Sequence, residues 1–91
     1  MPYCVVLTII DQELNQKVRP AHLRYLETLY RQGRVLMAGP FQDGLGGMVI
    51  YQNVTQEEAE RLAREDPAVA SGAREMALRP WTILDFASED A

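Results

Sequence analysis

The 91-residue sequence has very few of the residues that build disulfides and metal sites, with one cysteine, Cys4, and one histidine, His22. A single cysteine excludes an internal disulfide framework and fits a reducing compartment. A metal site made of several Cys or His side chains of one chain is excluded too, although carboxylates alone could hold a hard cation weakly. We therefore expect no metal centre and no other cofactor.

Positive charge is also scarce, because nine Lys and Arg residues stand against thirteen Asp and Glu residues, for a formal net charge of -4. Nucleic-acid binding depends on cationic side chains that neutralise phosphates, so we expect no nucleic-acid partner. No apolar stretch approaches the roughly 18 residues that a membrane span requires, and the N-terminus shows no signal-type segment. We expect a cytoplasmic protein that does not bind membranes.

What the sequence does contain suits one small core, with 47% hydrophobic and 24% charged residues. No linker, repeat or low-complexity tract divides the chain, so residues 1–91 are expected to form a single domain. A chain of this size buries only about 60 to 65% of the surface that it exposes when unfolded. The core of a monomer would be marginal, and a partner chain could add burial.

Hydrophobic periodicity and turn residues predict four strands and two main helices in the order β-α-β-β-α-β. Pro20 near the first helical position and Gly33 after the last turn indicate the first helix, and Thr55 with Glu58 forms a capping-box signature for the second. Asp66 before Pro67 is typical of the N-cap of one further helical turn. The expected strands are 3–10, 35–38, 48–52 and 74–86 with a bend or break at Pro80, the expected helices are 19–32 and 56–65, and residues 88–91 are expected to fray.

This order is that of the ferredoxin-like α+β sandwich, in which two helices cover one face of an antiparallel sheet. The first strand is apolar on both sides, with Val5 and Leu7 on one face and Cys4 and Val6 on the other. Two helices cannot cover both faces. We therefore predict that the second face packs against the same face of another copy, giving a homodimer through sheet-to-sheet packing.

His22 and Asp66 are the residues best suited to chemistry. His22 falls in the middle of the apolar arc of its helix, and Asp66 shares the direction of Ala59 and Leu62, so both should point inward. A histidine held by a carboxylate is a standard acid/base arrangement, and the ordinary histidine pKa of about 6.5 suits proton transfer near neutrality. The structural alternatives are a satisfied core histidine and an N-cap aspartate, and one carboxylate can serve both roles.

The other candidates carry weaker signals. Cys4 is interpreted as a small packed side chain rather than a reactive thiolate. Residues 43–47 (DGLGG) lack the ending of a phosphate-binding loop and connect two strands, so we interpret them as a flexible hairpin loop that could act as a lid. Tyr30 and Trp81 could line a pocket, with core or interface packing as the alternative for each.

Taken together, several motifs resemble the YciI-like (YCII-related) family. They are Arg19-Pro20-Ala21-His22-Leu23, Gly33-Arg34, Ala38-Gly39-Pro40, Gly46-Gly47, Glu57-Glu58-Ala59, Asp66-Pro67 with Gly72, and Arg79-Pro80-Trp81. The resemblance implies a ferredoxin-like protomer that dimerises into an α+β barrel with one pocket in each protomer. It also implies that His22 and Asp66 form the active site of a lyase-like or dehalogenase-like enzyme acting on small ring compounds. The connection from Pro40 to Gly46 is shorter than in many members, which leaves the lid and the substrate size open.

The leading hypothesis is a small dimeric enzyme of lyase, dehalogenase or isomerase type in which His22 is the general acid/base and Asp66 orients it. Gly39, Pro40, Ser71 and Tyr30 are expected to shape the pocket for a small organic substrate. The competing hypothesis is a non-catalytic small-ligand-binding or accessory module that uses the same pocket.

Overall fold

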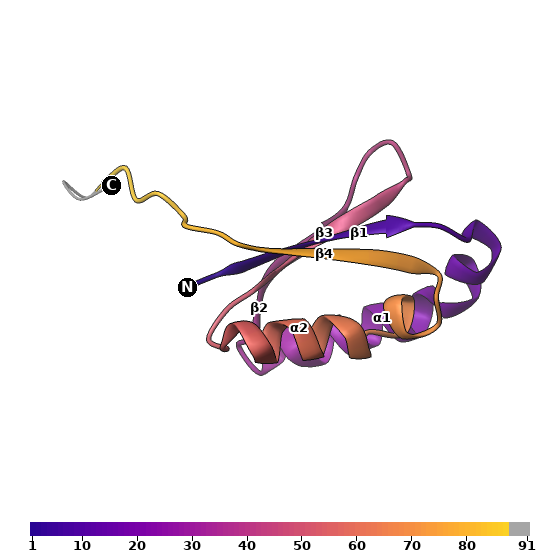
Figure 1. Ribbon diagram of the computed structural model, residues 1–91, viewed down its shortest axis with the longest axis horizontal. Coiled ribbons are helices and arrows are strands. Elements are labelled where there is room, and N and C mark those ends of the chain that lie inside the picture. Colours follow the sequence, from indigo (N-terminus) through magenta and orange to yellow (C-terminus); the bar gives the residue numbers. More distant parts are fainter. Residues whose placement is uncertain (88–91) are drawn as a thin grey trace.

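A four-stranded antiparallel sheet with helices against one face forms the body of the protein (Figure 1). The computed structural model describes residues 1–87, so the fraying predicted for 88–91 lies outside the described residues. The elements are β1 (Tyr3–Ile9), α1 (Gln12–Arg31), β2 (Val35–Pro40), β3 (Gly46–Tyr51), α2 (Gln56–Glu65), α3 (Pro67–Ala70) and β4 (Arg74–Pro80).

The sheet has the strand order β2-β3-β1-β4, and β1 pairs antiparallel with both β3 and β4. In the register, Val5 lies opposite Val49 on one side and Leu78 on the other, so these three side chains share a face. The helices pack on that face (Figure 1). This arrangement confirms the predicted ferredoxin-like α+β fold.

The core lies between this face of the sheet and the apolar stripes of α1 and α2. Val5 and Ala59 are completely buried, and Leu29 is 5% exposed. Burial of apolar area at about 25 cal/mol per Å² is the main favourable contribution to folding. The buried core residues are Val5, Leu7, Leu26, Leu29, Val35, Val49, Tyr51, Ala59, Leu62 and Ala63.

The start of α1 differs from the prediction, because the helix begins at Gln12 rather than near residue 19. Asp11 is its N-cap, and the Asp11 carboxylate accepts a hydrogen bond of 3.0 Å from the backbone N–H of Leu14. Pro20 therefore lies inside the helix, where it cannot donate to the Gln16 carbonyl. Two further turns of helix result, and they include the buried Asn15.

The second helical region agrees closely with the prediction. Thr55 and Glu58 form the capping box of α2, and Asp66 is the N-cap of α3 with Pro67 in its first turn. The fourth strand is shorter than predicted, because β4 ends at Pro80. A proline ring lacks the N–H that would continue the strand ladder, and the next residue, Trp81, donates its N–H to the Pro2 carbonyl at 2.9 Å.

The face of the sheet opposite the helices is only partly covered within the described chain. Val6 is half-buried and Thr8 is exposed, whereas Val5 and Leu7 on the helix side are buried. Cys4 is half-buried on this open face, with its Sγ 3.1 Å from the Sδ of Met48. The cysteine is therefore less deeply packed than the sequence suggested.

We predict that Gly46→Ala destabilises the fold while Gly39→Ala does not. Gly46 has φ +154°, and a Cβ there would overlap the Leu7 carbonyl, whereas a Cβ at Gly39 would meet nothing within 4 Å. The expected loss in free energy of unfolding is about 2 to 3 kcal/mol for Gly46→Ala and under about 0.5 kcal/mol for Gly39→Ala. Urea denaturation of both variants measures the difference, and equal stabilities would contradict this account of the β1–β3 pairing.

Candidate active site

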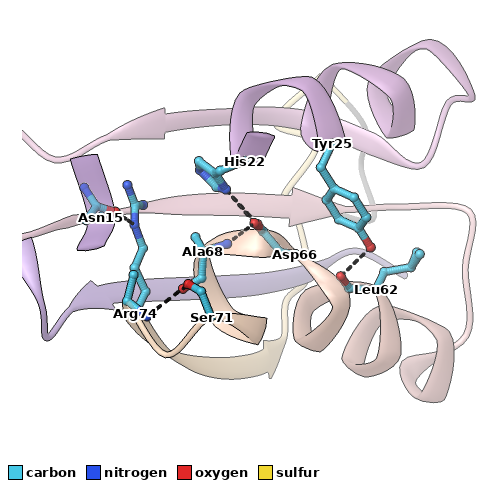
Figure 2. Close-up of polar contacts among 9 residues, drawn as sticks. Asn15, His22, Tyr25, Leu62, Asp66, Ala68, Ser71 and Arg74 are labelled. Atoms are coloured by element: carbon cyan, nitrogen blue, oxygen red, sulfur yellow. Dashed lines mark hydrogen bonds and ion pairs between the residues drawn. The ribbon is translucent and has the colours of Figure 1, made fainter. Parts of the chain in front are cut away.

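A buried contact between His22 and Asp66 lies where α1 meets the junction of α2 and α3 (Figure 2). The Nδ1 atom of His22 is 2.7 Å from Oδ1 and 2.9 Å from Oδ2 of Asp66. His22 is 5% exposed and Asp66 is completely buried. The structure therefore brings together the two side chains that the sequence predicted to face inward, 44 positions apart in the chain.

Asp66 also holds the backbone of the following turn. Its Oδ1 accepts a hydrogen bond of 2.9 Å from the N–H of Ala68, which caps α3. The two roles predicted for Asp66 thus coexist in one carboxylate. Because the cap fixes the carboxylate and the carboxylate fixes the imidazole, the ring orientation of His22 is set by the backbone of α3.

The opposite ring nitrogen of His22, Nε2, has no partner in the described chain. An ionised carboxylate only accepts hydrogen bonds, so Nδ1 carries the proton in this contact. No hydrogen bond joins Nε2 to residues 1–87, and every fully buried side-chain N or O atom among these residues has a partner. Nε2 must therefore be accessible, and His22 lines a cavity.

The cavity has a volume of about 700 Å³ and lies between α1, the helix-facing side of β1 to β3, and the loop before β3. Such a volume fits a small organic ligand. The predicted pocket residues Tyr30, Gly39 and Pro40 line it together with His22. Gly44 in the hairpin loop and Gly46 at the start of β3 line it as well, so the predicted loop segment borders the cavity.

Ser71 and Trp81 do not line this cavity, so the expected contribution of Ser71 to the pocket is not supported. The Ser71 hydroxyl accepts a 3.3 Å hydrogen bond from the Ala73 N–H and lies 3.4 Å from the Ala68 carbonyl. It stabilises the turn between α3 and β4 instead. Ser71 follows a short helix, and hydroxyls at such positions readily bond to the local backbone.

The sequence analysis missed several polar cavity residues, among them Asn15, Arg19 and Arg74. Arg74 donates from Nε to Oδ1 of Asn15 at 2.8 Å, and both side chains are buried. Burial lowers the pKa of Arg74, the Asp66 carboxylate opposes this shift, and the charge of Arg19 adds to it. The missed signal was the spacing of Asn15, Arg19 and His22 at i, i+4 and i+7, which places them on one helix face.

Two tyrosines complete the surroundings of the Asp66 carboxylate. Tyr25 on α1 donates its hydroxyl to the Leu62 carbonyl on α2 at 2.7 Å, which ties the two helices together. Burial, with the charges of Glu65 and Asp66, raises the pKa of Tyr25 to about 12. Burial also raises the pKa of Tyr51, and Asp66 adds to this shift. Both phenols therefore remain neutral at physiological pH.

Comparison with known proteins gives a consistent family. The sequence model of the YCII-related domain matches residues 1–82. The uncharacterized protein YjpA of Bacillus subtilis is 33% identical over 79 residues, covering 87% of this chain and 93% of its own length. Protein YciI of Escherichia coli is 36% identical over 80 residues, covering 76% of this chain and 82% of its own length.

Among solved structures, the fold resembles 5-chloro-2-hydroxyhydroquinone dehydrochlorinase (TftG) from Burkholderia phenoliruptrix, determined in complex with 2,5-dihydroxybenzoquinone. The TM-score is 0.75, and the match covers 90% of this chain and 94% of that chain. The sequences are 20% identical, so the likeness shows a common fold. In the residues that the structure describes, no helix is long and apolar enough to cross a membrane.

We predict that Asp66→Ala is far more destabilising than Asp66→Asn. Alanine removes the acceptor of the Ala68 N–H and leaves the buried Nδ1 of His22 without a partner, a loss of about 3 kcal/mol. Asparagine keeps one oxygen acceptor for the cap, so we expect a loss of about 1 to 2 kcal/mol. Chemical denaturation at pH 7 tests this. If both variants lose the same stability, the cap does not fix the carboxylate.

Proposed function

The chain belongs to the YCII-related domain family, and from this we propose that it is a small enzyme in which His22 acts as general acid/base on a small organic substrate. The proposal rests on the different surroundings of the two ring nitrogens of His22. Nδ1 is held by a completely buried carboxylate, and Nε2 is open to a cavity of about 700 Å³. A histidine buried for a structural role alone ordinarily has both ring nitrogens bonded to the protein or to an ordered water.

In the proposed reaction, Nε2 of His22 takes a proton from a C–H or O–H group of the bound substrate. The imidazolium that forms keeps its Nδ1–H on Asp66, which stabilises the positive charge. If the electron pair of the broken bond expels a leaving group, the result is elimination, as in a lyase or dehalogenase. If the proton returns to another carbon, the result is isomerisation. Neither outcome requires an oxidant or a reductant.

A hydroxylated six-membered ring is the substrate class to test first. The structural neighbour is a dehydrochlorinase of a chlorinated hydroxyhydroquinone, which supports elimination of HCl as one form of the proposed chemistry. The cavity provides flat and apolar surfaces for such a ring, with Tyr30 and Pro40 among its lining residues. Gly39 contributes backbone atoms to the same lining.

We predict that His22→Asn lowers turnover at least 100-fold, the usual contribution of a general base, and leaves the fold intact. The asparagine amide can still donate to Asp66 from nearly the position of Nδ1, but it has no group in place of Nε2. Release of chloride from 5-chloro-2-hydroxyhydroquinone and related halogenated hydroquinones, measured against an enzyme-free blank, reports turnover. Arg64→Gln, which changes an exposed residue of α2 outside the cavity lining, serves as the control.

Retention of the wild-type rate by His22→Asn would refute the assignment of His22. Absence of turnover and of solvent deuterium incorporation into every bound compound, in the wild-type protein, would favour a non-catalytic ligand-binding module. The two hypotheses therefore differ in a direct measurement.

We further propose that the protein is a cytoplasmic homodimer formed through the open face of the sheet. The support comes from apolar groups that the described chain leaves uncovered. Val6 and Cys4 are only half-buried in the central strand, and Met37 is 58% exposed in β2. The segment after β4 adds more uncovered apolar side chains, namely Trp81, Ile83, Leu84 and Phe86. A second copy would cover such a surface.

Sedimentation velocity at micromolar concentration is expected to give the mass of a dimer. Val6→Glu places a charge at the centre of the open face, and we expect it to shift the equilibrium toward monomer by at least tenfold in Kd. Thr28→Glu, on an exposed position of α1, should leave the mass unchanged. A stable wild-type monomer under these conditions would rule the interface out.

A further inference from the structure

A buried guanidinium faces the cavity without an anion of its own. Arg74, at the start of β4, is 9% exposed and lines the cavity. Its contact with a neutral side chain, the 2.8 Å bond from Nε to Asn15, is drawn in Figure 2. Within residues 1–87, no carboxylate oxygen lies within ion-pair distance of Arg74. Buried arginines are ordinarily paired with a carboxylate, so this one needs an explanation.

The donors that remain on Arg74 are its two terminal nitrogens. Neither makes a hydrogen bond with the residues that the structure describes. Fully buried side-chain nitrogens without a partner are absent from the same part of the chain. The terminal nitrogens are therefore accessible, and the cavity that Arg74 lines is the space that they reach.

The rest of the cavity lining reinforces the positive charge. Arg19 lines the cavity from α1 and is close enough to Arg74 to disfavour its charged form. Glu27 is the one acidic residue of the lining, and it is bonded to Arg31 at 2.7 Å in an exposed ion pair. Asp66 does not line the cavity. Its oxygens contact His22 and the N–H of Ala68.

We propose that the cavity binds its ligand as an organic oxyanion, such as a carboxylate or the ionised hydroxyl of a hydroxyquinone, on the terminal nitrogens of Arg74. The planar fork of a guanidinium matches two oxygens that share a negative charge. Asn15 orients this fork through Nε. Arg19 adds a second positive charge. Its attraction for the anion is weaker, because the side chain is exposed and the charge is screened by water and salt.

The terminal nitrogens of Arg74 would bind the anion at a position from which the rest of the ligand could reach His22. Asn15, Arg19 and His22 share one face of α1, so the anion-binding group and Nε2 lie along the same wall of the cavity. An oxyanion held by Arg74 would orient the rest of the ligand along that wall toward Nε2. This use rests on the proposed function, whereas the binding of the anion does not.

Binding of a matched pair of small probes to the full chain tests the subsite. Benzoate and benzamide have nearly the same shape and differ in charge, and isothermal titration or NMR titration gives their Kd values. We expect the wild-type protein to bind benzoate at least tenfold more tightly than benzamide. The compound 2,5-dihydroxybenzoquinone, titrated in parallel, tests an ionised hydroxyl in place of a carboxylate.

Arg74→Gln is expected to remove the preference for benzoate, and Arg74→Lys to keep part of it, since an ammonium supplies charge without the fork. Arg64→Gln removes the same charge from an exposed position of α2 whose ion-pair partner, Glu60, does not line the cavity, and it should change nothing. If Arg74→Gln does not fold, the wild-type protein still decides, because competition by added chloride should weaken benzoate binding and spare benzamide. Equal affinity for benzoate and benzamide would overturn the proposal. Absence of binding of both benzoate and 2,5-dihydroxybenzoquinone up to about 10 mM would overturn it as well.

The result is separable from that of the catalytic test. A loss of turnover in His22→Asn together with unchanged benzoate binding in Arg74→Gln would overturn the anion subsite and leave the general base in place. Binding of benzoate that depends on Arg74, in a protein that turns over no substrate, would support the subsite and contradict the proposed catalysis.

Discussion

The complete burial of the Asp66 carboxylate is the constraint on which the arrangement of the helices depends. A carboxylate without water is costly unless its oxygens are bonded, and here the bonds come from two different elements, the ring of His22 on α1 and the N–H of Ala68 in α3. A shift of either helix would leave a buried charge without a partner. The hydroxyl of Tyr25, bonded to the Leu62 carbonyl, holds α1 against α2 nearby. The same contacts that stabilise the fold therefore fix the orientation of the imidazole.

Features with a local cause could be predicted from the sequence. The capping box at Thr55, the N-cap at Asp66 and the inward direction of His22 depend on residues within a few positions, so spacing alone sufficed. The start of α1 was predicted wrongly, because Pro20 suits a first helical turn and the helix was therefore expected to begin near residue 19, whereas it begins after the N-cap at Asp11. That error left Asn15 outside the predicted helix. The pairing of Asn15 with Arg74 joins residues 59 positions apart, and no local pattern announces it.

Glycine is required at two positions where the strands approach each other closely. A Cβ at Gly46 would overlap the Leu7 carbonyl, and a Cβ at Gly47 would come within 2.7 Å of the Gly39 carbonyl, so the approach of β3 to β1 and β2 requires both residues to be glycine. At Gly39 nothing lies within 4 Å of a Cβ, so a side chain would be tolerated there. The sequence predicted a flexible loop at 43–47, but the constraint at its end is tight packing of the backbone.

The separation of charges around His22 suits the proposed proton transfer. Moving a proton from a substrate to Nε2 creates a cation on the imidazole and an additional negative charge on the substrate. Asp66 lies behind the ring and faces the first charge, while Arg74 lies on the cavity side, where the second would develop. The Asp66 carboxylate raises the pKa of Arg74, but the two side chains form no ion pair with each other in residues 1–87. Arg74 and Asp66 therefore do not neutralise each other by direct contact. Preorganised charges of this kind stabilise a transition state without reorganisation when the reaction occurs. A site that only binds an anion would need Arg74, whereas the proposed proton transfer would also use Asp66, whose carboxylate caps α3 and contacts His22 at the same time.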